Sequence, residues 1–160
     1  MFHALTRCVS WLALQALPLR CLVCSEPGAD GLDLCRACYA ALPWNDHACP
    51  VCALPLPEAA PVASCGMCLH DAPLQTAAAA TFVYAAPVDQ LILRFKFHND
   101  LAAGRLLSQL MLQRVPPFLI EPLMPMPLHR RRLRGRGYDL ALELTRPLAG
   151  GMVQPPWRRG

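Results

Sequence analysis

Apolar residues recur at helical spacing at the start of the chain. Intervals of three or four residues separate Phe2, Leu5, Val9, Leu12 and Ala16. Such spacing places them on one side of a helix. We therefore predict an amphipathic helix over about residues 2–17, in a segment 1–18 that packs on the rest of the protein.

A strand followed by two helices is predicted from Thr76 onward. The run Thr76–Tyr84 is interpreted as a strand. Pro87 then suits the first position of a helix that continues to about Lys96. A second helix is predicted over Leu101–Arg114.

The last part of the chain shows another strand and helix, separated by a basic loop. The apolar run Phe118–Pro127 predicts a buried strand that ends in proline-rich turns. Tyr138–Leu148 predicts a helix, with Leu140, Leu144 and Leu148 on one stripe. A strand, a loop and a helix in this order form the arrangement in which α/β sheets bind phosphate.

Cysteines and prolines dominate residues 18–72. Seven prolines leave room for tight turns, short strands and one short helix at Arg36–Leu42. The same stretch holds four C-x-x-C pairs, and two such turns facing each other enclose a tetrahedral Zn²⁺. We predict two structural zinc ions, held by Cys21, Cys24, Cys35, Cys38, Cys49, Cys52, Cys65 and Cys68.

Two pairings of these turns are compatible with the spacing. The sequential pairing closes the shorter loops and is favoured, while a crossed pairing of the first turn with the third stays open. A disulfide framework would need an oxidising compartment, and no small-residue cleavage site follows the N-terminal apolar stretch. We therefore expect reduced thiols and a cytoplasmic location, with Cys8 as a small buried apolar residue.

Charge is distributed unevenly along the 160 residues. Residues 1–80 carry three arginines against six carboxylates, a net charge of −3, whereas residues 81–160 carry twelve bases against five carboxylates, a net charge of +7. A polyanionic partner should therefore meet the second half. No apolar run approaches the roughly 18 residues that would cross a bilayer, so no membrane span is expected.

The basic loop is the second candidate site. Arginine forks can hold phosphate oxygens in pairs, and glycines allow backbone N–H groups to approach an anion. A solvated turn or a nucleic-acid tether is the plainer interpretation. The candidate phosphate or nucleic-acid contacts are Arg130, Arg131, Arg132, Arg134, Arg136, Gly137 and Lys96.

The order of these features resembles the ComF family of phosphoribosyltransferase-like proteins, which are associated with bacterial DNA uptake. The resemblance rests on the cysteine pairs, on Phe82–Asp100 (FVYAAPVDQLILRFKFHND) and on Met124–Ala149 (MPMPLHRRRLRGRGYDLALELTRPLA). It implies a small zinc-ribbon module at 19–72 and a type I phosphoribosyltransferase-like α/β domain at 73–160. It also implies that Leu128–Gly137 cradles the pyrophosphate of phosphoribosyl pyrophosphate, accompanied by Mg²⁺.

Two departures from the family pattern change what is expected of the chain. Asp139 stands where the family has asparagine, and its carboxylate should repel phosphate or pair with a neighbouring arginine. The family's acidic pair followed by Thr-Thr-Gly is absent from the sequence. We therefore expect an incomplete α/β domain, truncated at its C-terminal side, in which transferase activity is lost and catalytic residues are unknown.

Two functions of different class follow. In the first, a ComF-like protein linked to competence binds zinc and, through its basic loop, phosphate or phosphoribosyl pyrophosphate. In the second, a non-enzymatic zinc-ribbon protein binds single-stranded DNA or a protein of the uptake machinery. The two differ in ligand size and in the dependence of binding on salt.

Overall fold

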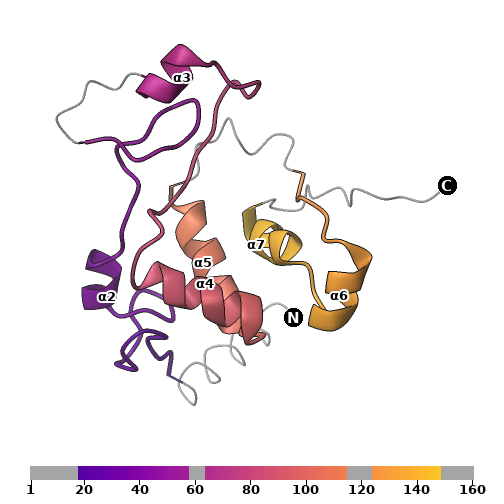
Figure 1. Cartoon of the computed structure of the whole chain (residues 1–160). Coiled ribbons are helices and arrows are strands. Elements are labelled where there is room, and N and C mark those ends of the chain that lie inside the picture. Colours follow the sequence, from indigo (N-terminus) through magenta and orange to yellow (C-terminus); the bar gives the residue numbers. More distant parts are fainter. Residues whose placement is uncertain (1–17, 58–63, 115–123, 149–160) are drawn as a thin grey trace, which may run out of the picture. The chain divides into compact units, whose positions relative to one another are not determined.

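A computed structural model of the chain describes residues 18–57, 64–114 and 124–148. Figure 1 shows helices joined by long irregular segments. The described residues contain six helices, and their only β pairing consists of isolated bridges. The predicted N-terminal helix, Cys8 and most of the predicted strand Phe118–Pro127 lie outside the described residues.

The chain divides into two compact units, Met1–Ala41 and Leu42–Gly160. The first unit contains the first two C-x-x-C pairs, and the second contains the other two together with helices α3 to α7. The domain limits predicted from the sequence, at residues 18 and 72, stay predictions.

A short hairpin and one helix form the described part of the first unit. Antiparallel bridges join Arg20 to Pro27 and Ala29 to Leu32. Helix α2 then runs over Arg36–Ala40, which confirms the predicted short helix with an end two residues earlier. Leu34, which is 1% exposed, and Cys21, which is 2% exposed, are the buried residues of this part.

The second unit begins with a similar hairpin, in which Ala48 pairs with Pro55, followed by helix α3 over Gly66–His70. The strand predicted at Thr76–Tyr84 is wrong. No described strand lies beside this segment to complete a ladder, and only Phe82 forms a bridge, with Trp44. Its backbone bonds instead to the ribbon: the Ala78 N–H donates to the Pro50 carbonyl at 3.1 Å.

Three predicted helices are confirmed in the second unit, and the one predicted at Tyr138–Leu148 is α7, Leu140–Leu148. Helix α4 spans Val88–Phe97 and α5 spans Leu101–Leu112. Asp100 begins α5 because its carboxylate accepts a hydrogen bond from the Ala103 N–H at 3.0 Å. The helices bury Val88, Leu91, Phe95, Ala103, Leu106, Leu107 and Leu110.

Phe95 and Gly104 allow α4 and α5 to approach closely. A Cβ atom on Gly104 would lie 2.4 Å from Phe95 Cε2, far inside van der Waals contact. On another side α5 packs against α7, Leu140–Leu148, where the buried Ser108 hydroxyl donates to the Leu144 carbonyl at 2.6 Å. Helix α5 is therefore the central helix of this layer.

The basic segment predicted as a loop is helical. Helix α6 covers Arg130–Arg136 and ends at Gly137, whose φ of 85° is the left-handed conformation that glycine adopts readily. Arginine is a good helix former, and His129 Nδ1 accepts a hydrogen bond from the Arg131 N–H at 3.3 Å. The described residues after 73 are therefore mainly helical and contain no parallel sheet, in contrast to the predicted α/β domain.

The carboxylate of Asp139 does not pair with a neighbouring arginine, as the sequence had suggested it could. Its side chain is turned into the protein, and the residue is 8% exposed. Its carboxylate accepts hydrogen bonds from Ala141 N–H and Leu128 N–H, both at 2.9 Å. Asp139 therefore caps α7 and binds the segment before α6, rather than pairing with an arginine.

Within the part of the chain that the structure describes, no helix combines the length and the apolar character needed to cross a membrane.

Candidate metal centres and a basic cavity

The eight cysteines of the C-x-x-C pairs form two groups of four. The first cluster contains Cys21, Cys24, Cys35 and Cys38, and the second cluster contains Cys49, Cys52, Cys65 and Cys68. Within each cluster the Sγ atoms all lie within 4.8 Å of one another. The grouping is the sequential one that the shorter loops favour.

The sulfur spacing fits a zinc ion. Cys24 Sγ lies 3.5 Å from Cys35 Sγ, and Cys52 Sγ lies 3.7 Å from Cys65 Sγ. A tetrahedron with Zn–S distances of about 2.3 Å has edges of about 3.8 Å, whereas a disulfide requires about 2.05 Å. Four sulfurs leave no position for water or substrate, so each site suits a structural metal.

The first C-x-x-C of each cluster is a tight turn with the same backbone bonds. In the first cluster the Ser25 N–H donates to the Cys21 carbonyl at 2.9 Å, and in the second the Ala53 N–H donates to the Cys49 carbonyl at 2.8 Å. Ser25 and Ala53 both adopt a left-handed backbone, with φ of 67° and 62°. The two turns are therefore structural repeats 28 residues apart, and the sequence shows the same relationship, because residues 21–27 and 49–55 share both cysteines, a valine and a proline at matching positions.

The second C-x-x-C of each cluster lies at the start of a short helix. Cys35 is the N-cap of α2 and Cys65 is the N-cap of α3. Cys38 and Cys68 follow one turn later, which returns both sulfurs of a pair to the same side. Each cluster thus combines a hairpin turn with a helix N-terminus.

Backbone N–H groups favour the ionised form of one thiol in each metal-free cluster. Burial opposes ionisation of Cys21, but N–H groups of Cys24, Cys35 and Val23 outweigh it and lower the pKa to about 6. For Cys49, the N–H of Cys65 at 3.3 Å is the main cause of a pKa lowered to about 6.

The remaining thiols show why the clusters suit a cation. Burial and then the neighbouring sulfurs raise the pKa of Cys68 to about 12, and the same causes raise the pKa of Cys38. Without a cation, further thiolates would repel the one already formed. Zn²⁺ supplies the charge that allows all four sulfurs to ionise and bind.

Histidines lie outside both clusters. His47 and His70 are exposed, and neither belongs to a group of potential metal ligands in the described residues. The predicted all-cysteine ligand sets therefore need no histidine substitute.

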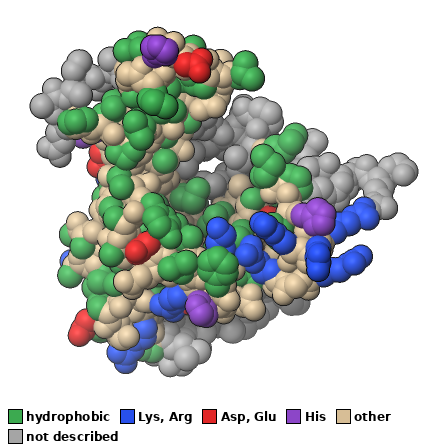
Figure 2. Space-filling model, viewed as in Figure 1, with side chains coloured by type: hydrophobic (Ala, Val, Ile, Leu, Met, Phe, Trp, Pro, Cys, Tyr) green, Lys and Arg blue, Asp and Glu red, His purple; other side chains and the backbone are tan. Residues whose placement is uncertain are grey.

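A basic cavity of about 540 Å³ lies between the end of α4 and α6. Its lining residues are Lys96, Phe97, Asn99, Arg132, Gly135 and Arg136. Arg132 and Arg136 are four residues apart, so they lie on the same face of α6. No carboxylate occurs among these lining residues, and Figure 2 shows Lys and Arg side chains gathered over this side of the second unit.

The predicted basic residues are thus separated into two sets. Lys96, Arg132 and Arg136 line the basic cavity, whereas Arg130, Arg131 and Arg134 are exposed and do not line it. Gly137 ends α6. Arg94 is bound elsewhere, because its guanidinium lies 2.6 Å from the Asp100 carboxylate.

Two residues that line the cavity, Phe97 and Asn99, were not predicted as site residues from the sequence. Phe97 is 62% exposed at the cavity, unlike the buried Phe95 two residues earlier. Asn99 adopts a left-handed backbone, with φ of 55°, in the turn between α4 and α5. The alternation of basic and aromatic residues at 94–97 was the available signal for Phe97.

Comparison with known families supports the metal assignment. Residues 13–69 match the family of double zinc ribbon domains. No curated protein matches the chain, and no solved structure matches it either. The family match and the two cysteine clusters together identify a zinc-binding double ribbon in the N-terminal part of the chain.

Proposed function

We propose that this protein is a ComF-like, cytoplasmic component of DNA uptake that binds phosphate or phosphoribosyl pyrophosphate beside its double zinc ribbon. The observation that carries the proposal is the basic cavity. Three cations from two helices, Lys96 on α4 and Arg132 and Arg136 on α6, line it together.

The chemistry of the lining favours an anion with several oxygen atoms. Guanidinium groups donate paired hydrogen bonds to phosphate, and an ammonium adds a compact charge. The amide of Asn99 can donate to a hydroxyl or to a further oxygen. A cavity of about 540 Å³ has room for a phosphorylated sugar.

Binding rather than group transfer is proposed. The sequence holds no adjacent acidic pair followed by Thr-Thr-Gly, the motif that the resemblance requires for holding ribose 5-phosphate. The lining of the cavity also offers no carboxylate to a divalent cation. Any Mg²⁺ would therefore arrive bound to the pyrophosphate oxygens of the ligand.

Calorimetric titration with pyrophosphate and with phosphoribosyl pyrophosphate tests the proposal. Arg132→Gln or Arg136→Gln should weaken binding about 10- to 100-fold, since each removes a charge-assisted hydrogen bond. Arg130→Gln is the matched control on the same helix, and it should leave the affinity unchanged. Equal small losses for all three variants would contradict a defined site.

One observation favours the second candidate function, binding of single-stranded DNA. Phe97 exposes an aromatic ring at the basic cavity, and Lys96 Nζ lies 5.7 Å from its centroid. Bases stack on such rings beside basic grooves. Fluorescence anisotropy with an oligothymidine separates the two functions: Phe97→Ala should weaken DNA binding and spare pyrophosphate, and DNA affinity should fall steeply with salt.

A protein of the uptake machinery is the remaining partner under the second function. It would bind the zinc ribbon or the exposed arginines of α6. In that case neither pyrophosphate nor the oligothymidine should bind at physiological salt.

A further inference from the structure

The second cluster belongs to the same compact unit as the helices, and its metal-binding turn is bonded to the segment that leads into them. Pro50 and Val51 are the two residues between Cys49 and Cys52. The Pro50 carbonyl accepts the Ala78 N–H at 3.1 Å, and the Val51 carbonyl accepts from the Gln75 amide at 3.4 Å. This turn is therefore hydrogen-bonded to residues 75–78, the segment that continues toward α4.

A second set of contacts joins the ribbon to the residues just before α4. Val83 N–H donates to the Pro43 carbonyl at 2.9 Å, and Asn45 N–H donates to the Thr81 carbonyl at 3.1 Å. The Asn45 side-chain amide donates in turn to the carbonyl of Ala53, the left-handed residue of the Cys49 turn, at 3.0 Å. Asn45 thus connects the metal-binding turn with the start of the helical layer.

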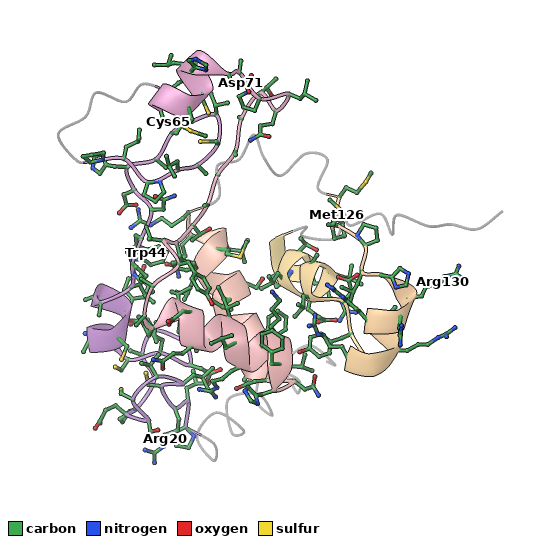
Figure 3. All side chains as sticks on the ribbon, viewed as in Figure 1. Arg20, Trp44, Cys65, Asp71, Met126 and Arg130 are labelled. Atoms are coloured by element: carbon green, nitrogen blue, oxygen red, sulfur yellow. The ribbon has the colours of Figure 1, made fainter. Side chains whose placement is uncertain are left out.

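Aromatic packing reinforces this connection. Trp44 stacks on Phe82 with their ring centroids 5.0 Å apart. Figure 3 labels Trp44 between the ribbon that contains Cys65 and the helices. The rings bury apolar area at the point where the hydrogen bonds converge, which strengthens the connection.

The end of α5 is attached to the same place. The Arg114 guanidinium lies 4.7 Å from the centroid of the Trp44 ring, and its Nη1 lies 2.6 Å from Asp46 Oδ1. The segment that leads into α4 and Arg114, two residues after α5, therefore both contact residues 43–46, which precede the second cluster in the chain.

From these contacts we infer that the metal of the second cluster has a role that the metal of the first cluster lacks: it holds α4 and α5 in place. Loss of the second metal releases the Cys49 turn, and with it the contacts at Pro50, Val51 and Ala53. Loss of the first metal affects the other compact unit. If the protein binds anions as proposed, the second metal also affects the basic cavity, because the lining residue Lys96 lies on α4. This part of the inference rests on the proposed function.

Two matched variants test this inference in the full chain. Cys24→Ser and Cys52→Ser each remove the second cysteine of the equivalent turn, and native mass spectrometry should show one zinc lost from each. Hydrogen exchange of α4 and α5 amides is then measured without ligand. Cys52→Ser should accelerate exchange at Leu91 and Leu106 at least about tenfold, the loss expected from one or more net hydrogen bonds, whereas Cys24→Ser should leave it unchanged.

A variant outside the clusters tests the contacts between ribbon and helices even if Cys52→Ser misfolds as a whole. Trp44→Leu should keep both zinc ions and still accelerate exchange in the last turn of α5, because Arg114, which follows that turn, loses the ring that it packs against. Unchanged exchange in α5 after Cys52→Ser has lost its zinc would overturn the inference, as would equal acceleration by Cys24→Ser.

Pyrophosphate affinity supplies a separate readout. It should fall in Cys52→Ser and persist in Cys24→Ser. If wild-type protein fails to bind pyrophosphate, the proposed function fails, while the exchange data still decide whether the second metal holds the helices.

Discussion

Tyr138 contacts Phe95 in two ways. Its hydroxyl donates a hydrogen bond to the Phe95 backbone carbonyl, and the two rings stack with their centroids 5.5 Å apart. Burial raises the pKa of Tyr138 above its usual range, so the hydroxyl keeps the proton that it donates. Because Tyr138 follows α6 and Phe95 precedes Lys96, this contact joins the two helices that line the basic cavity.

Substitutions of Tyr138 separate its two contacts. Tyr138→Phe should lower the free energy of unfolding by about 1 kcal/mol through the lost hydrogen bond. Tyr138→Leu should cost about 0.5–1.5 kcal/mol more, since the ring contact is also lost. Urea unfolding followed by circular dichroism measures both, and identical stabilities of the two variants would contradict a role for the stacking.

Gly104 should tolerate no larger residue. A methyl group there overlaps the ring of Phe95, so Gly104→Ala should destabilise the helical layer by about 1–3 kcal/mol. Gly135 on α6 is the control, because a Cβ atom there meets nothing within 4 Å. Gly135→Ala should be neutral or stabilise by up to about 1 kcal/mol, since alanine favours helix. Thermal unfolding of both variants tests the difference.

Asp139 should matter as a helix cap. Asp139→Ala removes the acceptor for Leu128 and Ala141 N–H groups, and we expect a loss of about 1–2 kcal/mol in the free energy of unfolding. Asp139→Asn retains an acceptor oxygen and should recover about half of this loss or more. If Asp139→Ala is as stable as wild type in urea unfolding, the cap has no energetic role.

The carboxyl group of Asp100 should titrate at low pH. Burial opposes its ionisation, but the Ala103 N–H and the Arg94 guanidinium outweigh burial and lower its pKa. A pKa lower in the folded than in the unfolded state stabilises the fold above the unfolded value, about 3.9, and this stabilisation disappears as pH falls through the folded value.

Carboxyl-detected NMR titration measures this pKa directly. Arg94→Gln should raise the Asp100 pKa toward about 3.9, because the ion pair at 2.6 Å is removed. A wild-type pKa above that value would contradict the assigned partners.

Local sequence signals predicted the elements that depend on local interactions. The four C-x-x-C pairs were sufficient to predict the ligands of both metal clusters, since each turn places two sulfurs side by side. The loop lengths then favoured the sequential grouping of the turns. Pro87 similarly marked the start of α4 through its backbone restriction, whereas the Asp100 cap of α5 was recognised only in the structure.

Elements that depend on distant partners were not predictable in this way. Whether Thr76–Tyr84 forms a strand is decided by its neighbours, and those are the irregular residues 43–50 rather than another strand. Helix α6 was missed for another reason: the arginines and glycines were interpreted as an anion-binding loop, although His129 and Gly137 are suitable caps for a helix.

The basic cavity was predictable in one respect and not in another. Lys96 and the α6 arginines were recognisable as candidates from their charge alone. Their meeting at one cavity, together with Phe97 and Asn99, follows from packing of α4 against the segment after α6 through Phe95 and Tyr138, which no local pattern encodes.

Zinc counting by native mass spectrometry on a double variant tests the sequential clusters most directly. Cys24→Ser combined with Cys35→Ser removes two ligands of the first cluster and none of the second. The protein should then retain one zinc ion, against two in wild type. Loss of both zinc ions would indicate crossed pairing, in which Cys24 and Cys35 serve different metals, and would contradict the two clusters described above.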